Sequence, residues 1–396
     1  MRILTIGTSP YLLDSKGKMN ADLLVGLKKM GHDVISAVWY LDTSWFCPTS
    51  DKIYNFEKNN NLICEIIPIS LSVQKSTPQL YEIIKKVKPE IVISISDYNN
   101  ISLIYAIKNL DSELFKWIFL CAADNGPINH TFHEAFGLID MACSTTKKIS
   151  KEIEKIKGEE CLYTPYGPKS LFEYKEAEVF SKKLKIICCS KNVQQSNISS
   201  LIIASSYIKN EDFEIYIHTN HSDVGEIDLL SLSKRYGVEE KIKFPEKFVS
   251  LNDGIEEKDL CDIYNSSDVI ADLSMGSSTS LCLLEGMRCG CMPLSLDTLS
   301  SSEILEKMPE KHKFTVRNVP FIAENEEEFF IADPEDIAIK IKNLIKIKNS
   351  KDYTKIKRIC RDVAKDFANE KFIENFCSLV KEVKNKSGNL NIEIVS

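Results

Sequence analysis

Short apolar runs alternate with stretches of helical periodicity along most of the chain, and this alternation restricts its fold more than any other feature. In the first half, runs of strand length rich in β-branched and aromatic residues occur at 2–7, 33–40, 62–69, 90–96, 116–124 and 138–144. Apolar residues recur at helical spacing in the intervening stretches 21–32, 78–89, 101–109 and 146–156. This order predicts βαβ units around a parallel sheet, and therefore an α/β fold.

The alternation stops at 165–183, which is irregular and charged, and then starts again. We expect strands at 184–190, 213–219, 241–244, 268–274 and 291–296, and helices at 197–209, 257–266, 279–289, 334–348 and 352–384. The stretch 297–330 is expected to be mostly loop. The pattern predicts four parts: an N-terminal domain (1–170), a linker (171–183), a C-terminal domain (184–350), and C-terminal helices with a frayed tail (351–396). In two doubly wound sheets, ligands bind at the carboxyl ends of the strands.

The balance of charge narrows the classes of partner. Fifty Lys and Arg stand against 57 Asp and Glu, which gives a net charge of −7. This acidity argues against nucleic acid as a partner, because a transferase acting on it would need a local basic groove. No apolar run approaches the roughly 18 residues of a membrane span, and the N-terminus lacks a signal-peptide core. We therefore expect a soluble, cytoplasmic protein; membrane association stays open, but no basic amphipathic helix in the N-terminal half indicates it.

The cysteines and histidines do not form a recognisable metal motif. The 13 cysteines contain no C-x-x-C pair, and most lie in apolar runs, so we expect buried, reduced thiols. The pairs His130/His133 and His218/His221 lack the glutamate of a zinc-binding H-E-x-x-H motif. There is also no G-x-G-x-x-G and no P-loop. We expect no metal and no cofactor.

The stretch 259–293, DLCDIYNSSDVIADLSMGSSTSLCLLEGMRCGCMP, is the most informative part of the sequence. Its loop 276–280 precedes a helix, whose unpaired N–H groups and dipole suit a diphosphate. Glu285 would lie about two turns into that helix, where its carboxylate could accept hydrogen bonds from vicinal hydroxyls. The simpler alternative is a Ser/Thr-capped helix with one surface glutamate.

The order of these segments resembles the family 4 glycosyltransferases (glycosyl transferases group 1) over nearly the whole chain. The resemblance rests mainly on DLCDIYNSSDV and LLEGMRCGCMP, and further on MRILTIG, GLKKMGHDV, KPEIVISISD, DMACS, PYGPK, SKNVQQSNISSLIIA, IYIHT and YGVEEKIKF. It implies the GT-B fold, in which two Rossmann-like domains face a central cleft. It also implies retaining, metal-independent transfer of a sugar from a nucleotide-sugar that is bound mainly by the C-terminal half.

The family's donor-binding positions correspond here to Lys191, Ser196, Gly276, Ser277, Ser278, Thr279, Ser280, Leu281 and Glu285. Several of them depart from the family pattern. Ser277 replaces a sugar-contacting glutamate, Ser278 and Ser280 replace glycines, and Lys191 replaces an arginine. A second cation is lost at Gln195 or Ser196, and Tyr166-Gly167 replaces a histidine-glycine pair. One lost cation could cost a few kcal/mol in the transition state, unless Lys183, Lys185 or Arg288 replaces it.

Candidate residues in the N-terminal half follow predicted strands. Asp97 and Asp124 end two of them and are the candidate catalytic groups, while Gly17 in the first loop and His130 are acceptor-side candidates. Turn-forming aspartates and a surface histidine explain the same residues equally well.

Two functions follow from these observations. The first is a glycosyltransferase that uses a nucleotide-sugar, which we expect to be a UDP-sugar, and a carbohydrate, glycan, protein or lipid-linked acceptor. The alternative is a catalytically degenerate homologue that binds a nucleotide-sugar or acts as a partner subunit.

Overall fold

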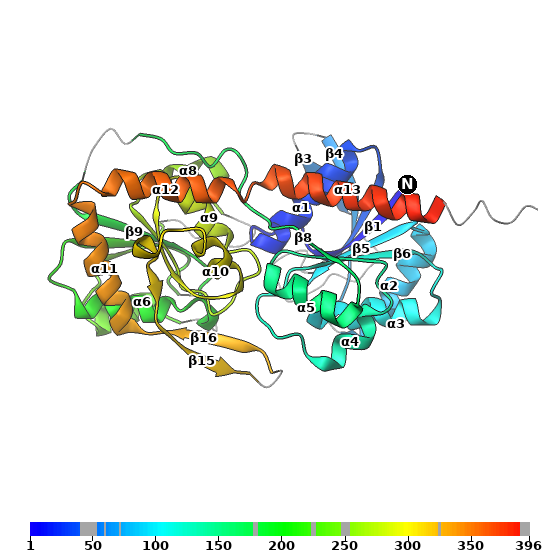
Figure 1. Ribbon diagram of the computed structural model, residues 1–396, viewed down its shortest axis with the longest axis horizontal. Coiled ribbons are helices and arrows are strands. Elements are labelled where there is room, and N and C mark those ends of the chain that lie inside the picture. Colours follow the sequence, from blue (N-terminus) through cyan, green and yellow to red (C-terminus); the bar gives the residue numbers. More distant parts are fainter. Residues whose placement is uncertain are drawn as a thin grey trace, which may run out of the picture. The chain divides into compact units, whose positions relative to one another are not determined.

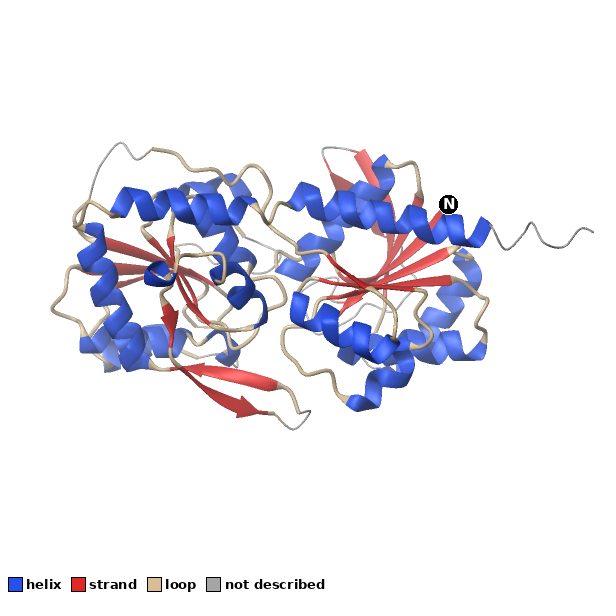
Figure 2. Ribbon diagram, in the orientation of Figure 1, coloured by secondary structure: helices blue, strands red, loops and turns tan. Residues whose placement is uncertain are grey.

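The computed structural model describes residues 1–39, 54–58, 61–70, 73–176, 181–222, 227–246, 254–323 and 326–388. They form two compact units, coloured by sequence in Figure 1. Unit 1 consists of Met1–Pro165 and the chain from Glu370 onward, and unit 2 consists of Tyr166–Asn369. In each unit, helices flank a mainly parallel sheet (Figure 2), which confirms the predicted α/β class.

The sheet of unit 1 has eight strands in the order β3-β4-β2-β1-β5-β6-β7-β8. Its strands are β1 (Arg2–Thr8), β2 (Asp33–Trp39), β3 (Tyr54–Lys58), β4 (Asn61–Pro68), β5 (Ile91–Ser96), β6 (Lys116–Cys121), β7 (Met141–Ser144) and β8 (Cys161–Tyr163). All pairs are parallel except β3 with β4. β3 and β8 were not predicted. YNFEK is too short and polar, and CLY too short and isolated, to show a strand pattern.

The α-helices of unit 1 are α1 (Ser15–Lys29), α2 (Val73–Val87), α3 (Ile101–Leu110), α4 (His133–Phe136) and α5 (Lys147–Lys157), with short 3₁₀ turns at Tyr98–Asn100 and His130–Phe132. The chain returns to this unit through α13 (Asn369–Gly388). A Cβ atom at Gly26 of α1 would lie 2.7 Å from Ile373 Cγ2 of α13, so these two helices pack closely. This contact explains why the C-terminal helix belongs with the N-terminal sheet.

The sheet of unit 2 has six parallel strands in the order β11-β10-β9-β12-β13-β14. They are β9 (Leu184–Cys189), β10 (Phe213–His218), β11 (Ile242–Lys243), β12 (Val269–Asp272), β13 (Met292–Leu296) and β14 (Thr315–Val316). The helices are α6 (Ile198–Tyr207), α7 (Leu229–Arg235), α8 (Glu257–Asn265), α9 (Leu281–Arg288), α10 (Leu299–Leu305), α11 (Pro334–Lys348) and α12 (Tyr353–Lys365), with 3₁₀ turns at Gln194–Ser196 and Glu310–His312. Side chains of the central strands are almost fully buried, as their continuous apolar runs require.

Two predictions for the last hundred residues were wrong. The stretch 297–330, expected to be mostly loop, contains α10, β14 and most of an antiparallel hairpin of β15 (Asn318–Ile322) and β16 (Glu328–Ala332). The helix expected at 352–384 is two helices, separated at 366–368. Phe367 lies in this break with 4% exposure, and its carbonyl oxygen occupies the place where a Cβ atom of Gly167 would stand. The break is therefore fixed by packing, which periodicity does not show.

The borders of the two units differ from the predicted domain borders. Unit 2 begins at Tyr166, before the predicted linker, and Phe172 is packed in its core with 1% exposure. Residues 177–180 of that linker lie outside the described residues. The helices expected as a separate C-terminal part are divided, since α12 belongs to unit 2 and nearly all of α13 to unit 1.

The twelve described cysteines are all free and buried or half-buried. Burial raises the pKa of Cys64, Cys161 and Cys291 to about 12 in each case. Such thiols are poor nucleophiles and fit a structural role. Within the described part of the chain, no group of three or more Cys, His, Asp or Glu side chains is arranged to hold a metal, and no helix there could cross a membrane.

Replacing Gly286 by alanine should destabilise unit 2 by about 1–3 kcal/mol. A Cβ atom at this position of α9 would lie 2.7 Å from Ile270 Cβ on β12, so the helix would have to move away from the sheet. Urea unfolding of the single and double variants with Ile270→Ala measures this effect. The cost of Gly286→Ala should be smaller in the Ile270→Ala background, and equal costs in both would contradict the close contact.

Candidate functional site

The strand order of unit 2 reverses between β9 and β12, so the loops that follow these strands diverge at one point of the sheet edge. At such a switch point, ligands bind at the carboxyl ends of the strands. The two loops are joined directly, because the Met275 amide donates to the Gln195 carbonyl at 2.7 Å. Asn197 Nδ2 donates to the Leu273 carbonyl at 2.8 Å and to the Phe330 carbonyl at 3.1 Å. The predicted donor residues on both loops are therefore brought together.

The loop 276–280 is held by hydroxyl groups. Ser277 Oγ accepts a hydrogen bond from the Ser280 amide at 2.9 Å and a longer one from the Thr279 amide at 3.4 Å. Ser300 of α10 donates to the Ser277 carbonyl at 2.8 Å, and its Oγ lies 2.7 Å from Ser280 Oγ. Ser300 is not among the predicted site residues, because the stretch 297–330 was expected to be mostly loop, although Thr298 and Ser301 form a capping box there.

Ser277 therefore has a role that its sequence position did not predict. The resemblance placed it where the family has a sugar-contacting glutamate, whereas here its hydroxyl accepts the amide of Ser280, the N-cap residue of α9. Ser280 itself has a left-handed backbone (φ 42°) and makes no side-chain cap. Because Ser277 accepts the amides of Thr279 and Ser280, these two N–H groups are not free to bind an anion. The free N–H groups that remain are those of the first turn of α9.

Glu285 is buried rather than on the surface, which rules out the simpler alternative of a surface glutamate. It has 1% exposure, and Tyr264 of α8 donates its hydroxyl to Glu285 Oε2 at 3.1 Å. Burial raises the pKa of Tyr264, and neighbouring Cys189, Cys282 and Glu285 raise it further, so the phenol stays protonated as a donor. Glu285 lies just over one turn into α9, not two, since the helix begins at Leu281.

A buried hydroxyl in the loop has no partner among the described residues. Thr279 has 3% exposure, and its Oγ1 atom makes no hydrogen bond. An unsatisfied buried hydroxyl is unfavourable by about 1–3 kcal/mol. A ligand with acceptor oxygens would relieve this cost, as phosphate and sugar oxygens do. Leu281 is also buried, with 7% exposure, and as the first residue of α9 its amide has no partner within the helix.

Positive charge is scarce at this edge of the sheet. Lys191 follows β9, is exposed, and has no ion pair with any residue in the described ranges. The three substitutes considered above do not reach the loops. Lys183 and Lys185 stand at the amino end of β9, and Arg288 ends α9, where its Nε donates to the Phe172 carbonyl at 3.2 Å. They belong to the opposite edge of the sheet, which excludes them as ligands of the diphosphate.

A carboxylate also stands at this edge. Asp272, the last residue of β12, accepts a hydrogen bond from Ser274 Oγ at 2.8 Å. Burial raises the pKa of Asp272, although bonds from Ser274 and Ser280 partly oppose the shift. Ser196, the candidate for the lost cation position, is buried at 6% exposure in the 3₁₀ turn after β9, and Gly276 and Ser278 complete the loop.

In unit 1 the strand order reverses between β1 and β5, and the candidate catalytic residues lie there. The Asp124 amide donates to Asp97 Oδ2 at 3.3 Å, so the two aspartates lie next to each other. Lys16, which sequence analysis missed, forms an ion pair of 2.9 Å with Asp124 Oδ2. Burial lowers the pKa of Lys16, but Asp124, Asp97 and Asp14 outweigh it and the net shift is upward. The lysine therefore stays charged and neutralises part of this acidic cluster.

The two acceptor-side candidates of unit 1 lie in different surroundings. Gly17 is in the first turn of α1 rather than in the loop, since the helix begins at Ser15 and its N-cap Asp14 accepts the Gly17 amide at 2.7 Å. A Cβ atom there would lie 2.4 Å from the Leu12 carbonyl oxygen, so the glycine is required by backbone packing. His130 is exposed in a 3₁₀ turn, as a surface histidine would be.

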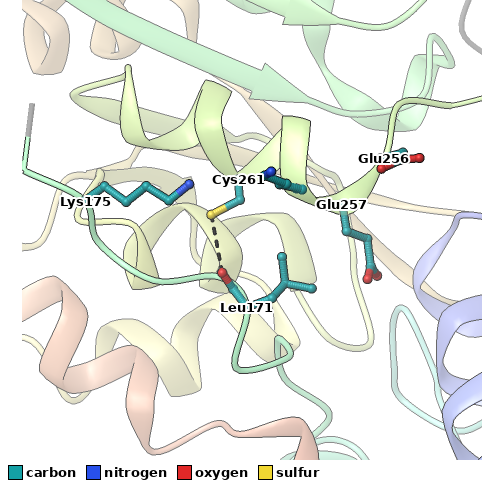
Figure 3. Close-up of a pocket in the computed structure, with 6 residues that line it drawn as sticks. Leu171, Lys175, Glu256, Glu257 and Cys261 are labelled. Atoms are coloured by element: carbon teal, nitrogen blue, oxygen red, sulfur yellow. Dashed lines mark hydrogen bonds between the residues drawn. The ribbon is translucent and has the colours of Figure 1, made fainter.

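A cavity of about 550 Å³ lies elsewhere in unit 2, near the start of α8 (Figure 3). Its lining consists of Leu171, Lys175, Glu256, Glu257, Lys258 and Cys261. None of the predicted donor residues is among them. Two of its four charged side chains are paired, Lys175 with Asp262 and Glu257 with Lys169.

Comparison with known proteins gives a consistent picture of the fold. No family model and no curated protein matches the sequence. Sucrose-phosphate synthase from Thermosynechococcus elongatus is similar in structure, with a TM-score of 0.74, 13% identity, and coverage of 98% of this chain and 100% of the other. An E. coli trehalose-6-phosphate synthase bound with UDP-2-fluoro glucose gives a TM-score of 0.68 at 10% identity, covering 96% of this chain and 99% of the other.

The catalytic domain of starch synthase IV from Arabidopsis thaliana, bound to ADP and acarbose, gives a TM-score of 0.62 at 10% identity, covering 96% of this chain and 98% of the other. These likenesses extend over both units of the chain. Since identities this low establish the fold alone, the conclusion from them is architectural. The chain has the GT-B fold with two Rossmann-like domains that these sugar-transferring enzymes share.

Proposed function

We propose that this protein is a glycosyltransferase that moves a sugar from a nucleoside-diphosphate sugar, bound by unit 2, to an acceptor hydroxyl at unit 1. The observation that supports it most is the switch point of unit 2. There, the loops after β9 and β12 are hydrogen bonded to each other, and a buried Thr279 hydroxyl without a described partner lies next to the start of α9. A helix start and unpaired hydroxyls are chemically suited to phosphate and sugar oxygens.

Different residues would bind the diphosphate, the ribose and the acceptor hydroxyl. Lys191 and the first-turn amides of α9 would stabilise the leaving diphosphate without a metal, because developing charge is best met by fixed cations and dipoles. Glu285 remains the candidate for the ribose hydroxyls, as the family resemblance implies. Asp97 and Asp124 would orient the acceptor hydroxyl, with Lys16 keeping their charges in balance.

A UDP-sugar is the proposed donor, and retention of anomeric configuration the proposed outcome. The E. coli relative holds a UDP-sugar analogue, whereas the starch synthase holds ADP, so the two relatives differ in base. We propose a carbohydrate or lipid-linked acceptor.

The second candidate function is a homologue that binds a nucleotide-sugar without transferring it. The specific observation behind it is the scarcity of cations, since Lys183, Lys185 and Arg288 are on the wrong edge of the sheet and Asp272 adds a negative charge.

Incubation with a panel of UDP-, GDP- and ADP-sugars separates the two functions. We expect release of nucleoside diphosphate from at least one donor, measured in the presence of simple sugars as acceptors and in their absence. Binding of a donor without any release would contradict the transferase and support the non-catalytic homologue.

Donor binding should strengthen as the pH falls through the raised pKa of Asp272. The protonated carboxyl no longer repels the diphosphate, whereas the anion above this pKa does. Asp272→Asn should therefore bind UDP-glucose about tenfold more tightly at pH 8 and lose the pH dependence. Titration calorimetry from pH 4 to pH 8 measures this, with the exposed Asp259→Asn as control. An unchanged pH profile in Asp272→Asn would show that the carboxylate does not face the donor.

A further inference from the structure

The β15–β16 hairpin exposes a continuous apolar face. In its register, Val319 pairs with Ile331 and Phe321 with Phe329, so these four side chains lie on one face of the two strands. Val319 is 59% exposed, Phe321 53% and Ile331 43%, and Phe329 is half-buried. Figure 1 shows the hairpin extending from the body of unit 2.

The opposite face attaches the hairpin at the end near the core, whereas Ile322 on that face, near the tip, is 60% exposed. Phe330 packs against the core of unit 2, and Ala332 on the same face is buried at 1% exposure. In a two-stranded sheet with one face on the core, the outer face is ordinarily polar. Here the outer face instead consists of four apolar side chains. An exposed apolar patch of this kind marks a binding surface.

The hairpin is tied to the donor loop through its backbone. The Phe330 amide donates to the Met275 carbonyl at 3.3 Å, and Asn197 Nδ2 donates to the Phe330 carbonyl at 3.1 Å. Met275 directly precedes Gly276, the first residue of the loop 276–280. Whatever covers the outer face is therefore held close to the proposed donor site.

Area and charge disfavour two occupants of the outer face, a second copy of the chain and an anionic lipid surface. With roughly 200 Å² for one aromatic side chain, the outer face exposes on the order of 300 Å². Two such faces would bury about 600 Å², half of the ~1,200 Å² that a stable interface needs. A dimer formed through this face alone would therefore have too small an interface to be stable. Residues 318–332 contain four glutamates and no Lys or Arg, which disfavours an anionic lipid surface.

We propose that the outer face of the β15–β16 hairpin inserts among the acyl chains at the surface of an uncharged bilayer. It thereby brings the donor loop of unit 2 to an acceptor held in that bilayer. The second part rests on the proposed function, because it assumes that a sugar is transferred. The first part does not depend on it, and lipid binding can be measured without turnover.

Co-sedimentation of the full chain with phosphatidylcholine vesicles tests the proposal. We expect the wild-type protein to sediment with the vesicles and the double variant Val319→Ser/Phe321→Ser to bind at least tenfold more weakly. The matched controls Ile339→Ser and Leu110→Ser remove exposed apolar side chains outside the hairpin, 54% and 75% exposed, and should bind like wild type. Adding phosphatidylglycerol should not strengthen binding, because the hairpin has no basic residue.

Three results would overturn the proposal: no sedimentation of the wild-type protein, equal binding of the double variant, or a wild-type dimer in sedimentation velocity that the double variant loses. Thermal unfolding of the variant checks its integrity, and a large loss of stability would mean that the face packs against another surface of the same chain. Vesicle binding without release of nucleoside diphosphate would instead refute the proposed function and leave lipid binding intact.

Discussion

Replacing Asp268 by alanine is expected to cost unit 2 about 3–5 kcal/mol of unfolding free energy. Asp268 precedes β12 with 6% exposure, and its carboxylate is bonded on both oxygens. Oδ2 accepts the Lys185 amide at 2.7 Å and pairs with the ammonium group of Lys348, while Oδ1 accepts the hydroxyl of Tyr353. One side chain thus joins β9, β12 and the ends of α11 and α12.

The expected loss of unfolding free energy is large because Asp268→Ala leaves the partners of the carboxylate buried. Lys348 has 5% exposure, so the variant would bury an ammonium group without its counter-ion. Urea unfolding followed by circular dichroism measures the loss. The exposed pair Arg358–Asp362 is a suitable control, since Asp362→Ala should cost below about 0.5 kcal/mol. A loss below about 1 kcal/mol for Asp268→Ala would show that the network is not intact in solution.

Lys191→Ala should lower the rate of sugar transfer by about 10²- to 10³-fold, the effect of removing one preorganised charge-stabilising group. Lys191 is the cation identified on the loop after β9, and the departing diphosphate has no metal to meet its charge in the proposed mechanism. Lys191→Arg should keep the activity or raise it, because the guanidinium can bind two phosphate oxygens at once.

Matched variants make this prediction specific to one edge of the sheet. Lys185 lies six residues before Lys191 and Arg288 three residues after Glu285, but both stand at the opposite edge of the sheet. Lys185→Ala and Arg288→Ala should therefore transfer sugar at close to the wild-type rate. Initial rates of nucleoside diphosphate release compare the four variants. A loss in Lys185→Ala or Arg288→Ala as large as in Lys191→Ala would mean that the donor binds elsewhere.

Much of the fold could be predicted from the sequence because a buried parallel strand has a strong signal. Runs such as EIVISIS and LKIICCS are apolar on both faces, and β5 and β9 lie within them. Strands β3 and β15 gave no such signal, because each belongs to an antiparallel pair with many exposed residues. The break between α12 and α13 depends on Phe367 and Gly167, which are 200 residues apart in number and meet only in the folded chain.

The candidate site was predictable in position and not in detail. The loop 276–280 and its helix follow from their sequence order, but the role of Ser277 depends on Ser280 and Ser300. The burial of Glu285 depends on Tyr264, which stands 21 residues earlier. Strand direction alone excludes Lys185 as a ligand, since it is the second residue of the strand Leu184–Cys189. The expected strand 184–190 begins next to Lys185, so the sequence already contained this argument.

Equilibrium titration of the wild-type protein and Lys191→Ala with UDP, GDP and ADP tests the central claim most directly, namely that the switch point of unit 2 binds a nucleoside diphosphate. We predict that the wild-type protein binds at least one of the three, that Lys191→Ala weakens this binding tenfold or more, and that Lys185→Ala does not. Wild-type protein that binds none of them, or a Lys191→Ala variant with unchanged affinity, would contradict the account.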